Sequence, residues 1–523
     1  MKRIYLMMIA LLTVLLLAGC GNSQGTYMPT GDGLGDVIAP PSATEPQVQS
    51  LSLTYYPEET MNPLNCTEYI NRVVGSLVYQ GLFSVDREYN VQPVLCKNYR
   101  ISRDMKSYTF YVEAATFSDG TVLTAQDVVA TLQAAKTSQV YQGAKTSQVY
   151  QGRFNHVTKI SLTEDQGVLV ELDTPYENLP LLLDVPIIPE RDVASDRPLG
   201  TGPYVLDENS GLAVLRRNQN WWCESTDLVA TVGVVTLLTA ESPVQIRDNF
   251  QFSGLSLACA DPGSDKFADY RCDYELWSCE NGIFLYLAFS ADSEIFQNDT
   301  LRTAVTYAID RDMLAENYYR SFAQGASLPA SPQFPYYNQN LAVKYSFSSE
   351  KFAAAVEQSG MQGAEVTLLV NSADSLRVRV AREIAQMLTA GGLKVNMSEL
   401  SGSNYTYAVQ TRQFDLYLGQ TMLSPNMDLS AFFHTYGALS YGGVNELTAY
   451  TLCLESLANY GNYYSLYKYI MENGLLCPVL FRSYAVYATR GAVTDLNPAR
   501  DHIFYYTIGK DMEHALLREE ADS

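Results

Sequence analysis

Residues that usually carry catalysis or bind metals are scarce in this sequence. The 523-residue chain has four histidines and nine cysteines, and no two cysteines stand in a CxxC pair. The histidines do not have the spacing of metal ligands, and no HExxH or Walker-type stretch is present. We therefore expect no catalytic residues, no metal site and no cofactor. A secreted hydrolase is an alternative, but it would need a nucleophile and a base together, and none is visible at recognisable spacing.

Positive charge is also in short supply. Lysine and arginine number 35 against 57 aspartates and glutamates, which gives a net charge of −22. Nucleic acid binding needs basic patches, so nucleic acid is not an expected partner. Apolar residues make up 47% of the chain, enough for a large core, and the length is too great for one simple domain.

The chain begins with the pattern of an export signal. Lys2 and Arg3 precede an apolar run from Ile4 to Leu17, which is shorter than the roughly 20 apolar residues of a membrane span. No second long apolar run follows. The sequence indicates export, with a body that is not embedded in the bilayer.

A cysteine follows this run directly. Leu17, Ala18, Gly19 and Cys20 resemble the lipobox of bacterial lipoproteins, in which the cysteine is lipidated and becomes the N-terminus. The resemblance implies a signal peptide at 1–19 and an extracytoplasmic protein anchored to the cell membrane through Cys20. An ordinary cleaved signal with a chance cysteine is the alternative.

The next segment and the other cysteines are less specific. Residues 20–47 are rich in Gly, Pro, Ser and Thr, which predicts a flexible tether. The remaining eight cysteines are scattered. Outside the cell they permit disulfides, and Cys272 with Cys279 would close a small loop, but buried free thiols fit the pattern equally well.

Strand and helix patterns alternate along the body. Ser107–Val112 has strand-like content, and a Ser-Asp-Gly turn follows it. Thr124 is then a helix cap with Asp127 pointing back to it, and an apolar helix face follows. The next sequence feature is a tandem duplication: AKTSQVYQG occurs at 135–143 and again at 144–152, which predicts a lengthened loop or an extra helical turn.

A second clear unit lies further along the chain. We predict a strand at 366–370, a helix at 375–388 and a strand at 393–397, with two glycines ending the helix. The stretch DTLRTAVTYAIDRDML, residues 299–314, predicts one capped helix with an apolar face. The fold class is therefore α/β.

Several motifs in order resemble one protein family. They are LVYQGLF (77–83), YTFYVEAATFSDGTVLTAQDVVATL (108–132), GTGPYVL (200–206), RRNQNWW (216–222), LRTAVTYAIDRDML (301–314) and GASLPASPQFP (325–335). Together they resemble the extracytoplasmic solute-binding proteins, family 5, that deliver oligopeptides, dipeptides or nickel complexes to ABC importers. The resemblance covers roughly residues 51 to 506.

The resemblance implies a fold and a division of the chain. It implies a two-lobed periplasmic-binding-protein-like hinge fold of type II, with an extra α/β subdomain. The first lobe would comprise 48–79, 191–284 and 482–523, the subdomain 80–190, and the second lobe 285–481. Such a protein closes around its ligand at the hinge.

The implied function is capture of a peptide or peptide-like solute and its delivery to an ABC permease and ATPase. The lipid on Cys20 would keep the receptor close to that permease. A peptide-sensing receptor without transport, or a binder of a non-peptide solute, is the alternative.

The resemblance also carries over candidate ligand contacts. Family members bind extended peptides with main-chain hydrogen bonds, and the strand FDLYLGQTML (414–423) corresponds to the one along the ligand. The implied contact residues are Tyr69, Tyr150, Asp261, Gln420, Thr421, Met422, Phe481 and Arg482. Ordinary packing is the alternative role for each.

One departure from the family pattern bears on the ligand. The peptide binders carry Ala-Asp-Tyr after this strand, and that Asp pairs with the free amino group of the peptide. Leu423 and Ser424 occupy the place here, and Asp428 is the nearest carboxylate. We therefore expect a cleft that does not depend on a free α-amine.

Overall fold

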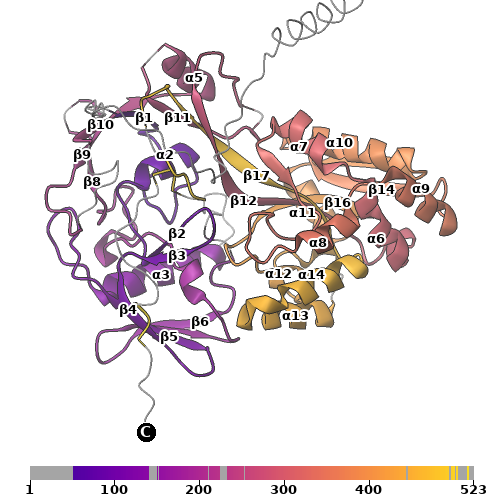
Figure 1. Ribbon diagram of the computed structural model, residues 1–523, viewed down its shortest axis with the longest axis horizontal. Helices are drawn as coiled ribbons and strands as arrows, with labels where there is room; N and C mark the ends of the chain where they lie inside the picture. The colour runs from indigo at the N-terminus through magenta and orange to yellow at the C-terminus, as the bar shows by residue number, and fades with distance from the viewer. Residues whose placement is uncertain are drawn as a thin grey trace, which may run out of the picture. The chain divides into compact units, whose positions relative to one another are not determined.

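A computed structural model describes residues 51–140, 150, 152–209, 211–223, 232–252, 254–264, 266–442, 446–493, 496–500, 502–504 and 515–517 (Figure 1). Cys20, the predicted signal peptide 1–19 and the predicted tether 20–47 lie outside these residues, as does most of the second repeat copy.

The first sheet joins strands from distant parts of the chain. Its order is β1-β10-β9-β8, with β1 parallel to β10 and the other neighbours antiparallel. The helix α2 (Tyr69–Gly75) packs near β1. The strands are β1 (Leu51–Tyr55), β8 (Tyr204–Asp207), β9 (Val214–Arg217) and β10 (Val234–Thr239).

A second sheet is antiparallel throughout and has the order β4-β5-β7-β6. Its strands are β4 (Cys96–Ile101), β5 (Ser107–Val112), β6 (Val157–Leu162) and β7 (Val168–Leu172). The predicted strand 107–112 is confirmed by β5. The hairpin of β2 (Phe83–Val85) and β3 (Val91–Pro93) precedes this sheet.

Helix α3 (Ala125–Val140) covers part of this sheet, because it packs on β6 and β7. Its predicted start is confirmed: the Asp127 carboxylate accepts hydrogen bonds from the Thr124 amide at 2.9 Å and its hydroxyl at 2.6 Å. The predicted apolar face is buried, with Val128 and Leu132 fully inaccessible.

The largest sheet has seven strands, in the order β11-β17-β12-β16-β14-β15, with β13 also paired to β17. The strands are β11 (Leu257–Ala260), β12 (Glu275–Phe289), β13 (Ala323–Gly325), β14 (Glu365–Asn371), β15 (Lys394–Leu400), β16 (Leu416–Met422) and β17 (Cys477–Ala488). Figure 1 shows β12 and β17 side by side, running from the region of β11 toward that of β14 and β16.

Helices cover the seven-stranded sheet through two separate cores. One core packs α6, α7 and α10 against it, and the other packs α12 and α14. The α helices not yet bounded are α5 (Pro243–Gln251), α6 (Asp299–Ala308), α7 (Arg311–Tyr319), α8 (Gln339–Ala342), α9 (Ser349–Gln358), α10 (Ser375–Ala390), α11 (Gly402–Gln410), α12 (Ser430–Phe433), α13 (Leu447–Ala458) and α14 (Tyr463–Glu472).

The strand–helix–strand unit predicted at 366–397 is confirmed by β14, α10 and the parallel strand β15. The single helix predicted at 299–314 is wrong. It is divided into α6 and α7, because Ile309 and Asp310 take extended backbone angles and the Asp310 side chain caps α7 by accepting from the Met313 amide at 3.1 Å.

The cysteines of the described region carry free thiols, so the loop closure considered for Cys272 and Cys279 does not occur. Cys279 is buried in β12, whereas Cys272 is half-buried in the segment before it. The predicted lobe boundaries at 284/285 and 481/482 fall inside β12 and β17, the two longest strands.

Candidate functional site

An arginine in β17 joins two of the predicted contact residues. Nη2 of Arg482 donates to both carboxylate oxygens of Asp261, at 2.7 and 2.8 Å, and Nη1 donates to the Gln420 side-chain oxygen at 3.2 Å. Asp261 follows β11 and Gln420 lies in β16, so the network links three strands of the seven-stranded sheet. A Cβ on Gly263 would overlap the guanidinium, so a larger residue there would require the Arg482 side chain to shift.

The charge of Arg482 is preserved although its side chain is only 6% exposed. Burial by itself lowers the pKa of this group, but the Asp261 carboxylate outweighs burial and the pKa of Arg482 is raised. The pair with Asp261 therefore places a neutral but strongly polar group at the middle of the sheet.

Tyr69, at the start of α2, lies against the same strand. Its ring stacks on Tyr484 with centroids 3.7 Å apart and planes 19° from parallel. Nη2 of Arg72 donates to the Tyr484 hydroxyl at 3.2 Å. Burial raises the pKa of Tyr69 well above its ordinary value, so the phenol stays neutral. Tyr484 follows Arg482 by two residues, so both side chains lie on one face of β17.

Three predicted residues are mainly packed. Phe481 is 1% exposed and stacks on Phe284, with ring centroids 4.9 Å apart. Thr421 is buried opposite Phe284 in the pairing of β16 with β12, and Met422 is half-buried against a core cluster. Gln420 is thus the β16 residue of this set whose side chain joins the polar network.

The backbone of β16 is paired unequally on its two edges. Strand β12 pairs with it from Leu416 to Met422, whereas β14 pairs with it only at Leu416 and Tyr417. Among the described strands, residues 418–422 therefore have no partner on the edge away from β12. Such an edge offers amide and carbonyl groups to an added extended segment.

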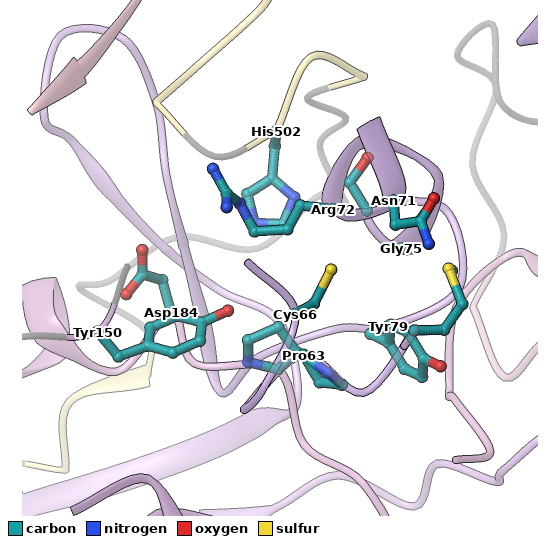
Figure 2. Close-up of a pocket in the computed structure, with 12 residues that line it drawn as sticks. Pro63, Cys66, Asn71, Arg72, Gly75, Tyr79, Tyr150, Asp184 and His502 are labelled. Carbon is teal, nitrogen blue, oxygen red and sulfur yellow. The ribbon is translucent and has the colours of Figure 1, made fainter. Parts of the chain in front are cut away.

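Tyr150 lies apart from this network and lines a cavity. Figure 2 shows Tyr150 and Asp184 on one side of it, Tyr79 on the opposite side, and Arg72, Asn71 and His502 above. The full lining is Met61, Pro63, Cys66, Asn71, Arg72, Gly75, Ser76, Tyr79, Tyr150, Asp184, Pro186 and His502. Arg72 connects the two regions, because it lines the cavity and also donates to Tyr484.

The carboxylate beside this cavity is already neutralised. Nε and Nη2 of Arg153 donate to the two oxygens of Asp184 at 2.8 and 2.7 Å, and both side chains are buried. Burial opposes ionisation of Asp184, but Arg153 outweighs it and the pKa of Asp184 is lowered. The guanidinium also lies 5.1 Å from the centroid of the Tyr150 ring, so the ion pair positions the predicted contact residue.

The described residues contain no cluster of three or more His, Cys, Asp or Glu side chains able to hold a metal ion. In the same part of the chain, every helix is too short or too polar for a bilayer span.

Comparison with known proteins assigns the chain to a family. Residues 90–442 match bacterial extracellular solute-binding proteins, family 5 middle. The chain belongs to this family. Family 5 proteins are the substrate-binding components of ABC importers, and the resemblance drawn from the motifs is confirmed.

Individual relatives of this family 5 protein bind different solutes. The glutathione-binding protein GsiB of Escherichia coli O1:K1 is 22% identical over 368 residues, which cover 67% of this chain and 69% of GsiB. The ABC transporter substrate-binding protein CtaP of Listeria monocytogenes has a TM-score of 0.68 at 17% identity, covering 87% of this chain and 97% of CtaP. The oligopeptide-binding protein AppA of Bacillus subtilis, in complex with a nonapeptide, has a TM-score of 0.60 at 18% identity, covering 88% and 99%.

These likenesses confirm the predicted α/β periplasmic-binding-protein-like fold of type II. They concern the fold, since the solved structures are less than 25% identical to this chain. The named relatives are solute-binding proteins and not enzymes, in line with the absence of catalytic motifs.

The Asp428 carboxylate of this family 5 protein already accepts hydrogen bonds from other groups of the chain. Its Oδ1 accepts from the Ser430 amide at 2.8 Å, and its Oδ2 accepts from the Ser430 hydroxyl at 2.8 Å and from the Asn155 amide side chain at 3.2 Å. The His156 ring lies 3.6 Å from the same oxygen. Ser424 is buried and donates to Asn426 at 2.7 Å.

Sequence reasoning missed Arg72, Arg153, Asp184 and Tyr484. Tyr484 could have been found, because Arg482 was already a candidate and side chains two residues apart share one face of a strand. The pairing of Arg153 with Asp184 could not have been found, since two residues separated by 31 positions leave no local sequence pattern.

Proposed function

We propose that this family 5 protein is the lipid-anchored extracytoplasmic receptor of an ABC importer. It captures a peptide or peptide-like solute between two lobes, whose bounds we take as 48–79, 191–284 and 482–523 for the first and 285–481 for the second, and passes it to the permease. The segment 80–190 is the extra subdomain.

The observation that carries this proposal is the edge of β16 at 418–422, with which no other strand of the described residues pairs. An extended peptide added there would gain main-chain hydrogen bonds without requiring a particular side chain. The Arg482–Asp261–Gln420 network lies at the same strand and supplies polar groups that orient the solute. In this proposal Tyr69 and Tyr150 border the cleft, while Thr421, Met422 and Phe481 support the strand.

Strand addition makes a specific prediction about peptide chemistry. Native mass spectrometry of protein purified from its own host identifies the bound solute. If it is a peptide, N-methylation of alternate backbone amides should weaken binding about fivefold for each hydrogen bond lost, since one bond contributes roughly 1 kcal/mol. Methylation of the intervening amides is the control and should have a smaller effect.

Two results would refute strand addition. Equal affinities for both methylated series would mean that the protein recognises the side chains of the peptide and not its backbone. A non-peptide solute in the native complex would favour the alternative binder. Transport and sensing are separated by uptake of the labelled solute in cells that lack the chain.

The lipid anchor rests on the Leu17-Ala18-Gly19-Cys20 sequence. In the host, Cys20→Ala should abolish incorporation of a labelled fatty acid and release the protein from membranes. The half-exposed Cys223 provides the control, because Cys223→Ala should leave labelling unchanged. Membrane retention of the Cys20→Ala protein would exclude the lipobox interpretation.

A further inference from the structure

A buried histidine lies between two carboxylates that follow strands of different sheets. Nδ1 of His156 is 2.9 Å from Asp173, and Nε2 is 3.6 Å from Asp428 and 3.1 Å from the Ser430 hydroxyl. His156 directly precedes β6 and Asp173 directly follows β7, both in the four-stranded antiparallel sheet. Asp428 and Ser430 follow β16 of the seven-stranded sheet.

The contact between His156 and Asp428 is supported by a neighbouring side chain, and further hydrogen bonds nearby join the same parts of the protein. The Asn155 side chain donates to Asp428 at 3.2 Å. The Glu177 amide donates to the Leu457 carbonyl at 2.8 Å, and the Glu177 carboxylate accepts from the Tyr460 amide at 2.5 Å. The two sheets share no strand among the described residues, so movement between them would separate all of these groups.

We propose that His156 and Asp428 form a proton-dependent latch that holds the 80–190 segment against the segment after β16 when the cleft is closed. This inference rests on the proposed closure of the lobes, and it adds a control on that closure by pH.

The other titratable groups that face this contact stay neutral around pH 7. They are Tyr176, whose ring centroid lies 5.9 Å from that of His156, and Tyr450, Cys453, Tyr460 and Tyr463, which interact with Asp428. Burial raises the pKa of each of the five above its ordinary value. Between pH 5 and pH 8, His156 is thus the group of this cluster whose charge changes.

The sign of the effect follows from the surroundings of His156. Burial by itself lowers the pKa of the imidazole, but Asp428 and Asp173 outweigh burial and raise it above 6.5. The latch is therefore fully present below about pH 6.5 and is lost as pH rises through the higher value of the closed state. The pKa of Asp428 is lowered, because His156 and Ser430 outweigh its burial, so the latch persists until pH falls through that lowered value.

The test uses the ligand-free mature protein between about pH 5.5 and about pH 8, the range in which histidine titrates. Solution scattering gives the radius of gyration, and urea unfolding gives the stability. We expect the radius to increase and the urea midpoint to fall as pH rises. His156→Gln should remove both pH-dependent steps. His434→Gln is the control for a second, exposed histidine beside the same cluster, since its ring lies 5.0 Å from that of Tyr450, and it should keep the wild-type profile.

A second variant covers the case in which His156→Gln does not fold. The Asp173 side chain is 54% exposed, so Asp173→Asn should fold and leave the His156 ring in place. It removes one of the two carboxylates that raise the pKa of His156 and should shift both steps to lower pH. A merely structural histidine would give no such shift in the profile.

The latch is overturned if His156→Gln retains the wild-type profile, or if stability changes with pH while the radius of gyration stays constant. The proposed function fails in a different way. In that case no solute from the host compacts the protein, at any pH, although the urea midpoint still depends on His156.

Discussion

The Arg153–Asp184 pair allows the effect of burial on an ion pair to be measured directly. Asp184→Asn preserves the size of the side chain and removes its charge. The Arg153 guanidinium would then remain in a site where its side chain is 0% exposed, without the carboxylate that accepts from Nε and Nη2. Removing one partner of a buried pair typically costs about 3–5 kcal/mol, roughly a hundredfold to a few thousandfold in the unfolding equilibrium.

The surroundings of Asp184 favour the upper part of that range. Leu183 and Val185 on either side of it are buried, and the backbone pairs at Gly81 and Pro186. A Cβ on Gly81 would overlap the Asp184 carbonyl, so the two backbones are in close contact. The segment therefore has little room to relax and expose the guanidinium to water.

The chain contains a matched control with the same fork geometry at the surface. Nε and Nη2 of Arg382 donate to the Glu399 oxygens at 2.8 and 2.9 Å, but these side chains are 56% and 30% exposed. Glu399→Gln should cost at most about 1 kcal/mol, because water replaces the lost partner. The two substitutions thus differ mainly in burial.

Urea unfolding followed by fluorescence and circular dichroism measures both variants, and coincident transitions allow a free energy to be extracted. The pKa of Asp184 is lowered, so its stabilisation is present above pH 3.8 and is lost as pH falls through the lower value. Asp184→Asn should therefore also flatten the acid limb of the stability curve. Replacing both members, Arg153→Met with Asp184→Leu, should recover most of the loss. An Asp184→Asn cost as small as that of Glu399→Gln would refute the reasoning.

Three other predictions concern the cleft and the repeat. Gly263→Ala should destabilise by about 1–3 kcal/mol in thermal melting because its Cβ would overlap Arg482, and Gly233→Ala, with open space around it, should be silent. N-acetylation of a bound peptide should change its affinity less than about tenfold in calorimetry, because Asp428 already accepts three hydrogen bonds; a larger penalty that Asp428→Asn abolishes would contradict this. Deleting residues 135–143 should leave α3 intact, because the identical second copy restores its sequence. The free energy of unfolding should change by only about 0.6 kcal/mol, the cost of doubling the length of a loop. A loss of several kcal/mol would mean that the first copy packs specifically.

Local sequence patterns predicted the helices and strands, but they did not predict the contacts between residues far apart in the chain. The Thr124–Asp127 capping box and β5 were recognisable because their causes lie within a few residues. The break between α6 and α7 was missed although Asp310 is itself a capping residue, since the apolar pattern continues across it. The Arg482–Asp261 pair spans 221 residues, and no periodicity connects such positions.

The site was reached through the family motifs, and this limited what could be predicted. Those motifs located β16 and Arg482, but they did not indicate that Asp428 would be enclosed by Ser430, Asn155 and His156. That arrangement depends on two sheets meeting, which is a property of the folded chain and not of any one segment.

The strand order of the seven-stranded sheet has a consequence for biosynthesis. Strand β17 lies between β11 and β12, yet it ends at Ala488, about 200 residues after β12 ends at Phe289. At roughly 5–20 residues per second, a growing chain would hold β11 and β12 without their shared neighbour for about 10–40 s. The contacts of β17 are of high sequence separation, so they form late and slowly. A chaperone that shields the exposed strand edges of residues 257–289 during this interval would therefore raise the yield of folded protein.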